Sequence, residues 1–163
     1  MKFILCFIFM LISAKECDSK TAQKSTNTTS EVTALQSKKT SQIDTKITYQ
    51  ASTRGFFLKI WIEGDLIMVS KDNSLKSFET YPFPSEQKEA FLNLLSAIDK
   101  TELTTLETPS TTFQHDAAAM AWLEISDEEG SYRTKVFDHG NPPESIKEIV
   151  EKIQSLKSMV EKP

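Results

Sequence analysis

The sequence predicts an α+β fold, a two-layer sandwich in which an antiparallel sheet of about five strands carries two helices on one face. Apolar side chains alternate with polar ones in Phe56–Ile62, which is the period of a strand. Apolar side chains recur at helical spacing in the segments that follow Pro84 and Pro142. The resulting order of strands, helix, hairpin and helix is typical of an antiparallel sheet with its helices on one side.

Four strands are expected before the first helix: Ile47–Ala51, Phe56–Ile62, Leu66–Ser70 and Lys76–Tyr81. The fourth should lie near a sheet edge, because Pro82 and Pro84 follow it. Two tryptophans, Trp61 and Trp122, fall within predicted strands together with Phe57. We expect them in the core, and the alternative is an exposed aromatic patch that binds a ligand.

The second half of the chain predicts a helix, a hairpin and a final helix. Ser85 is the expected N-cap of the first helix, and the final helix should run roughly over residues 142–160. Between them, the strand Ala117–Ser126 should pair with Tyr132–Phe137 around a turn at residues 127–130.

Composition and charge exclude several classes of protein. The 163 residues carry a net charge of −4, so the cationic surface that binds nucleic-acid phosphates is missing. No apolar run reaches the ~18–20 residues that span a bilayer, which excludes a polytopic membrane protein. The two cysteines, Cys6 and Cys17, are too few for a disulfide-stapled miniprotein or a Cys-rich zinc module.

The N-terminus has the order of a secretory signal peptide. Lys2 gives a positive start, Phe3–Ile12 is a run of ten apolar residues, and Ser13-Ala14 supplies small residues for cleavage. Residues 1–17 are therefore expected to direct export, with cleavage near Ala14 or Cys17. The alternative is a buried N-terminal helix or strand of a cytosolic protein.

Cys17 leaves two kinds of exported protein open. An acylated cysteine near this position would make the chain a membrane-anchored lipoprotein, although Lys15 and Glu16 depart from the usual pattern before such a cysteine. Cleavage after Ala14 would instead release a periplasmic or secreted protein. A lipid on Cys17 is the only membrane contact that we expect.

A polar tether should separate this N-terminus from the folded domain. In residues 18–44, 11 of 27 residues are Ser or Thr, and no helical or strand period is visible. Such a segment buries too little apolar surface to offset the entropy of ordering. We therefore predict a disordered Ser/Thr/Lys-rich tether over residues 18–45 and an α+β domain over residues 46–163.

One group of residues could carry chemistry. The two histidines each lie beside an aspartate, in His115-Asp116 and Asp138-His139. If paired residue numbers across the second hairpin sum to about 257, Ala119 faces Asp138, and both dipeptides lie at one end of the sheet.

This cluster could bind zinc or a similar cation, or contact a partner. Alternatively, Asp116 and Asp138 could accept hydrogen bonds from loop amides. We expect the structural role, with no metal, no cofactor and no catalytic residue, because the sequence holds no Gly-rich phosphate loop, nucleophile elbow or HExxH motif.

Two stretches carry a resemblance to known proteins: Thr53-Arg54-Gly55-Phe56-Phe57, and the run from Phe137-Asp138-His139-Gly140-Asn141 to Pro142-Pro143. Over residues 50–158 the chain resembles uncharacterised envelope proteins of Bacteroidetes-type bacteria. Its order of elements is also similar to that of emfourin-type inhibitors of thermolysin-like metalloproteases.

The resemblance implies a non-enzymatic, exported interaction domain with a protein partner, and in its narrower form a protease-inhibitor-like module. The alternative is a small metal-binding or metal-dependent hydrolytic domain that uses the Asp/His loop end. We expect a monomer that binds no nucleic acid.

Overall fold

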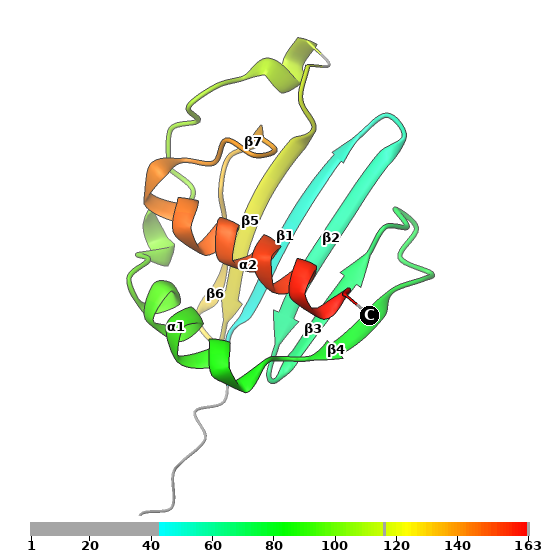
Figure 1. The fold of residues 1–163 in the computed structure, drawn as a ribbon. Coiled ribbons are helices and arrows are strands. Elements are labelled where there is room, and N and C mark those ends of the chain that lie inside the picture. Colours follow the sequence, from blue (N-terminus) through cyan, green and yellow to red (C-terminus); the bar gives the residue numbers. More distant parts are fainter. Residues whose placement is uncertain (1–42, 116, 163) are drawn as a thin grey trace, which may run out of the picture. The chain divides into compact units, whose positions relative to one another are not determined.

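The structure is a computed structural model that describes residues 43–115 and 117–162. The predicted signal peptide, Cys17, the tether up to residue 42 and Asp116 lie outside the described residues. The described part consists of an antiparallel sheet and two α-helices, so the predicted α+β class is confirmed (Figure 1).

The sheet has seven strands, where about five were predicted. Its order is β4-β3-β2-β1-β5-β6, and β7 also pairs with β5. Every pairing is antiparallel. The strands are β1 (Lys46–Thr53), β2 (Phe56–Glu63), β3 (Leu66–Ser70), β4 (Glu79–Pro82), β5 (Met120–Asp127), β6 (Gly130–Arg133) and β7 (Phe137–Asp138).

The predicted strand ranges number six, and the seventh strand arises because the predicted strand Tyr132–Phe137 is divided in two. Pairing in β6 joins Glu124 to Arg133, whereas pairing in β7 joins Ala121 to Phe137. The paired numbers therefore sum to 257 in β6 and to 258 in β7. One additional residue lies in the outer strand between the two pairings, which is a β-bulge.

The two helices begin at other residues than the sequence predicts, the first helix one residue earlier and the second helix later. Helix α1 spans Ser85–Ser96, with Pro84 rather than Ser85 at the N-cap and no side-chain cap, because Pro84 already has the extended ψ of 117° that an N-cap residue adopts. Helix α2 spans Lys147–Val160. It follows the short 3₁₀ helix Glu144–Ile146, because Pro143 is also extended.

The core lies between one face of the sheet and the two helices (Figure 1). Helix α2 contributes Ile149, Val150, Ile153 and Leu156, all at most 2% exposed, as its apolar spacing predicts. Ile43 is only 3% exposed and belongs to this core, so the predicted domain start at residue 46 omits a core residue. The inward side chains of the sheet are Ile47, Tyr49, Ala51, Leu58, Ile60, Ile62, Ile67, Val69, Ala121, Leu123 and Ile125.

The opposite face of the sheet is covered by neither described helix. Because side chains alternate along a strand, Trp61 and Trp122 point away from the buried Ile60, Ile62, Ala121 and Leu123. The prediction that the tryptophans lie in the core is therefore wrong. We call this surface the open face. Its outward residues include Thr48, Gln50, Ser52, Phe57, Lys59, Trp61, Met68, Met120, Trp122, Glu124 and Arg133.

Candidate functional sites

The bulge between β6 and β7 sets the position of the Asp/His loop end. Asp138 faces Met120, one residue beyond the predicted Ala119, because the bulge shifts the pairing. The shift lets Phe137 enter the core, where it is fully buried, and turns Asp138 toward the outer side. The backbone N–H of His139 then donates to the carbonyl of Ala119 over 2.8 Å.

The carboxylate of Asp138 holds a distant loop in place. It accepts hydrogen bonds from the backbone N–H groups of Thr112 (3.0 Å) and Phe113 (2.7 Å). It also accepts from the hydroxyls of Ser110 and Thr112. The side chain is only 3% exposed, and four donors match the roughly four lone-pair positions of a carboxylate. These contacts connect β7 with the 3₁₀ helix Thr112–His115.

These contacts also decide the charge of Asp138. Burial disfavours the ionised form, but the hydrogen bonds from Ser110, Thr112 and Phe113 outweigh burial and lower the pKa of Asp138 to about 2. Asp138 is therefore ionised at neutral pH. With its oxygens occupied by protein donors, it has little capacity left to ligate a metal.

His139 has different partners. Its Nδ1 lies 2.6 Å from the hydroxyl of Tyr49, a fully buried side chain on β1, and Nε2 of Gln154 donates to the same hydroxyl over 3.4 Å. Burial lowers the pKa of His139 and raises the pKa of Tyr49. The neutral pair is therefore favoured, and the tautomer of His139 determines which of the two groups donates. The ring of Phe56 lies 5.7 Å from that of His139.

The two other residues of the predicted cluster add no ligand that the structure describes. His115 is exposed at the end of its 3₁₀ helix, and Asp116 lies outside the described residues. Within residues 43–115 and 117–162, no group of three or more His, Cys, Asp or Glu side chains is arranged to hold a metal ion. Of the predicted cluster, the structure places Asp138 beside the loop 110–113 and His139 against Tyr49.

A second ordered loop, residues 71–77, lies between β3 and β4. Asp72 accepts hydrogen bonds from the N–H groups of Ser74 (2.9 Å), Lys76 (3.0 Å) and Ser77 (3.2 Å). Leu75 has a positive φ of 53° and is 40% exposed. The sequence predicts a turn at Lys71-Asp72-Asn73-Ser74, and the structure adds that the Asp72 carboxylate holds the loop as far as Ser77.

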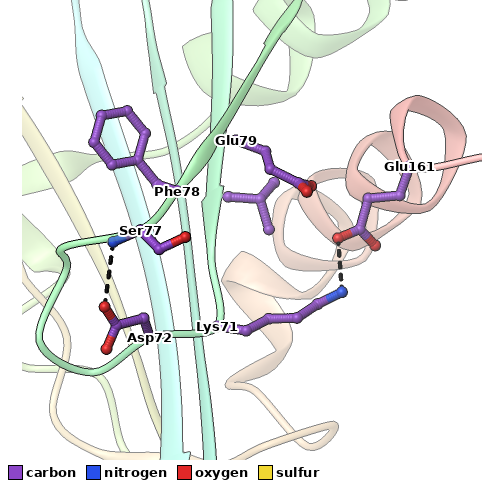
Figure 2. A pocket seen from close by; sticks show the side chains of 7 residues that line it. Lys71, Asp72, Ser77, Phe78, Glu79 and Glu161 are labelled. Carbon is purple, nitrogen blue, oxygen red and sulfur yellow. Dashed lines mark hydrogen bonds and ion pairs between the residues drawn. The ribbon is translucent and has the colours of Figure 1, made fainter.

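A cavity of about 230 Å³ lies between this loop and the end of α2 (Figure 2). Two of its charged groups are paired with each other, because Lys71 lies 3.1 Å from Glu161, which also pairs with Lys157. The ring of Phe78 points away from Glu79 and Glu161, toward the open face (Figure 2). The cavity lining is Val69, Lys71, Asp72, Ser77, Phe78, Glu79 and Glu161.

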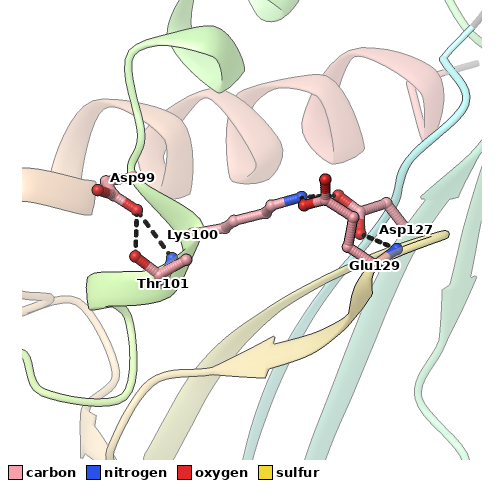
Figure 3. Close-up of polar contacts among 5 residues, drawn as sticks. All are labelled: Asp99, Lys100, Thr101, Asp127 and Glu129. Atoms are coloured by element: carbon pink, nitrogen blue, oxygen red, sulfur yellow. Dashed lines mark hydrogen bonds and ion pairs between the residues drawn. The ribbon is translucent and has the colours of Figure 1, made fainter.

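A third polar cluster connects the segment after α1 to the β5–β6 turn (Figure 3). Lys100 contacts Asp127 and Glu129, and Asp99 accepts hydrogen bonds from the N–H and hydroxyl of Thr101. The contacts to Asp127 and Glu129 raise the pKa of Lys100. A lysine held in the charged form by two carboxylates cannot act as a base at neutral pH, so the geometry indicates a structural clasp.

The open face presents both tryptophans of the chain. The guanidinium of Arg133 lies 5.1 Å from the centre of the Trp122 ring, and Nζ of Lys59 lies 5.5 Å from that of Trp61. Phe78, which is 52% exposed, packs against Trp61 with ring centres 5.5 Å apart. Met120 lies on the same face, on strand β5, and is 45% exposed. The open face is thus a flat, aromatic and partly cationic surface.

Among the described residues, no helix combines the length and hydropathy needed to cross a membrane. Comparison of the chain with protein-family models and with curated proteins finds no match.

Proposed function

We propose that the chain is a non-enzymatic interaction domain, exported to the cell envelope or secreted, that binds a protein partner through its open face. The observation that supports this proposal most directly is the position of Trp61 and Trp122 on a sheet face that no described helix covers. Exposed Phe78 and Met120 extend the same surface.

The chemistry of the open face fits a protein partner. Tryptophan and arginine are enriched where protein interfaces contribute most to affinity. Thr48 and Ser70, which share this face, are already 4% and 1% exposed, so the aromatic side chains lie over a tightly packed layer. A rigid surface of this kind loses little entropy when a partner covers it.

The non-enzymatic part of the proposal rests on how the described charged groups are used. Asp138 is occupied by four donors, Lys100 by two carboxylates and Glu161 by two lysines. Catalysis would need a base or nucleophile free to reach a substrate in a cavity. The alternative, a metal-binding or metal-dependent hydrolytic domain, has less support because Asp138 is so fully hydrogen-bonded.

The proposed export rests on the N-terminal sequence. The narrower protease-inhibitor function rests on the resemblance to emfourin-type proteins. Intact mass spectrometry of the chain purified from expressing cells tests whether the N-terminus is removed on export. A mass that begins at Met1 contradicts export, and a diacylated Cys17 selects the lipoprotein form. The inhibitor function requires that the chain slow peptide cleavage by a thermolysin-like protease at stoichiometric concentration.

The binding surface is tested by capture from the envelope fraction of the source cells. We expect the unmodified chain and Met159→Lys, an exposed change on α2 outside the open face, to capture the same protein. Phe78→Lys and Met120→Lys should lose it, because each places a charge within the proposed contact. Equal capture by all four proteins would contradict binding through the open face.

A further inference from the structure

We propose that the partner that covers the open face is a second copy of this chain, so that two sheets pack face to face in a twofold dimer. This inference rests on the proposed function and names its partner. It would replace the sequence-based expectation of a monomer. Sheets that pack in this way stack about 10 Å apart with interdigitating side chains.

The size of the open face is sufficient for such a dimer. Six strands about 4.8 Å apart and four outward rows about 6.8 Å apart give a projected area of roughly 500 Å² per copy. Two copies would therefore bury about 1,000 Å², which lies at the low end of specific interfaces. We accordingly expect a dimer that dissociates on dilution.

The charge of the open face favours self-association over contact through other surfaces. Its outward positions hold three cations, Lys46, Lys59 and Arg133, against three carboxylates, Glu63, Glu124 and the buried Asp138. Residues 46–163 as a whole hold 13 Lys and Arg against 19 Asp and Glu. The acidic charge is therefore concentrated outside the open face, and two copies repel each other least when these faces meet.

The open face also offers apolar groups on both of its sides. Phe78 and Trp61 lie toward the β3–β4 side, and Met120 and Trp122 lie on β5. In a twofold dimer, a residue on one part of the open face of one copy contacts a different part of the open face of the other copy. Apolar groups on both sides of the sheet therefore allow each copy to contribute and receive buried side chains.

The experiment combines sedimentation equilibrium with tryptophan fluorescence, using the chain purified from cells that express its full length. Because the only two tryptophans lie on the open face, both should become shielded in the dimer. From micromolar to millimolar concentration we expect the mass to double, the emission to shift to shorter wavelength and quenching by acrylamide to fall. The three changes should share one midpoint.

Two substitutions on the open face and one elsewhere test the surface. Phe78→Lys and Met120→Lys leave both tryptophans in place and change side chains that are 52% and 45% exposed, so the fold should persist. We expect each to raise the dissociation constant at least tenfold, about 1.4 kcal/mol. Met159→Lys, which changes a 39% exposed side chain on α2, should leave it unchanged.

Three outcomes would overturn the dimer. The first is a monomeric mass with exposed tryptophans at every concentration. The second is a monomeric mass with shielded tryptophans, which would mean that residues 1–42 or another molecule cover the face. The third is a dimer that both face variants retain. If a monomeric chain captures a different protein and the face variants lose that capture, the proposed function stands and the dimer falls.

Discussion

Two aspartates, Asp138 and Asp72, each accept several hydrogen bonds from one loop. Their donors lie at very different separations along the chain. The partners of Asp72 lie two to five residues away, at Ser74, Lys76 and Ser77. The partners of Asp138 lie 25 to 28 residues away, at Ser110, Thr112 and Phe113. Asp138 is buried, whereas Asp72 belongs to an exposed loop.

The comparison teaches that the same hydrogen-bond chemistry can stabilise different levels of structure. A carboxylate that bonds only its near neighbours fixes the shape of one loop, which can open without disturbing the core. A carboxylate that joins distant segments closes a long loop, and its loss frees the part of the connection between α1 and β5 that it holds, around residues 110–113. The four predictions below test this difference.

The largest effect is expected for Asp138→Ala. The change leaves the part-buried N–H groups of Thr112 and Phe113 without their acceptor, so we expect the melting temperature to fall by about 5 °C or more. Thermal unfolding followed by circular dichroism measures this. Asp138→Asn should also destabilise, because its NH₂ group would face donors. A change below about 1 °C for both variants would show that the loop is held by other contacts.

Acid should remove the contribution of Asp138 to the free energy of unfolding over a defined range of pH. Its folded pKa of about 2 lies below the ordinary value of 3.8, so the unfolded chain binds the proton more readily. The stabilisation is therefore fully present above about pH 4 and is lost as the pH falls toward 2. Urea unfolding of the parent chain and Asp138→Ala should differ most above this range and converge below it. A constant difference down to pH 2 would contradict the lowered pKa.

Protonation of His139 should lower the stability of the fold by a smaller amount and at a less acidic pH. Burial lowers its folded pKa below the ordinary 6.5, so protonation favours the unfolded chain. The stabilisation is present above about pH 6.5 and declines as the pH falls through the folded pKa, when protonated Nδ1 cannot accept a hydrogen bond from Tyr49. His139→Gln should flatten this part of the stability profile. A parent chain that gains stability from pH 7 to pH 5 would give the opposite sign.

The smallest effect is expected for Asp72→Ala. The loop 71–77 should lose its fixed shape, and the amides of Ser74, Lys76 and Ser77 should exchange hydrogen faster, while the melting temperature changes by less than about 2 °C. Hydrogen exchange measured by NMR separates the local effect from the global one. If Asp72→Ala destabilised the domain as much as Asp138→Ala, the distinction between the two loops would be wrong.

The fold class could be predicted because its signals are periodic. Alternation placed Leu58, Ile60 and Ile62 on the buried face, and helical spacing placed Ile149 and Ile153 in the core. The orientation of the two tryptophans was missed because their large apolar area favours burial. Strand alternation, which already set Trp61 opposite Ile60 and Ile62, determined their side. The bulge between β6 and β7 has no comparable sequence signal.

The candidate sites could be predicted only in part. Asp138 and His139 were found because they precede a sharp loop, and a carboxylate there is well placed to accept amides. Their partners could not be named, because Ser110, Thr112 and Tyr49 are distant in sequence and become neighbours only through the tertiary fold. The roles predicted for Cys17 and Asp116 concern residues outside those described.

The bulge between β6 and β7 also determines how a change of chain length during evolution would affect the two faces of the sheet. Deleting one residue from 134–136 would remove the bulge, and the regular pairing would keep Phe137 opposite Ala121 and Asp138 opposite Met120. A one-residue slip of the outer strand without a deletion would instead set Asp138 opposite Ala119 on the apolar side and turn Phe137 toward water. Point substitutions at the exposed Lys135 carry no such consequence. Homologous chains that are one residue shorter at this bulge should therefore keep the same side chains on the two faces of the sheet.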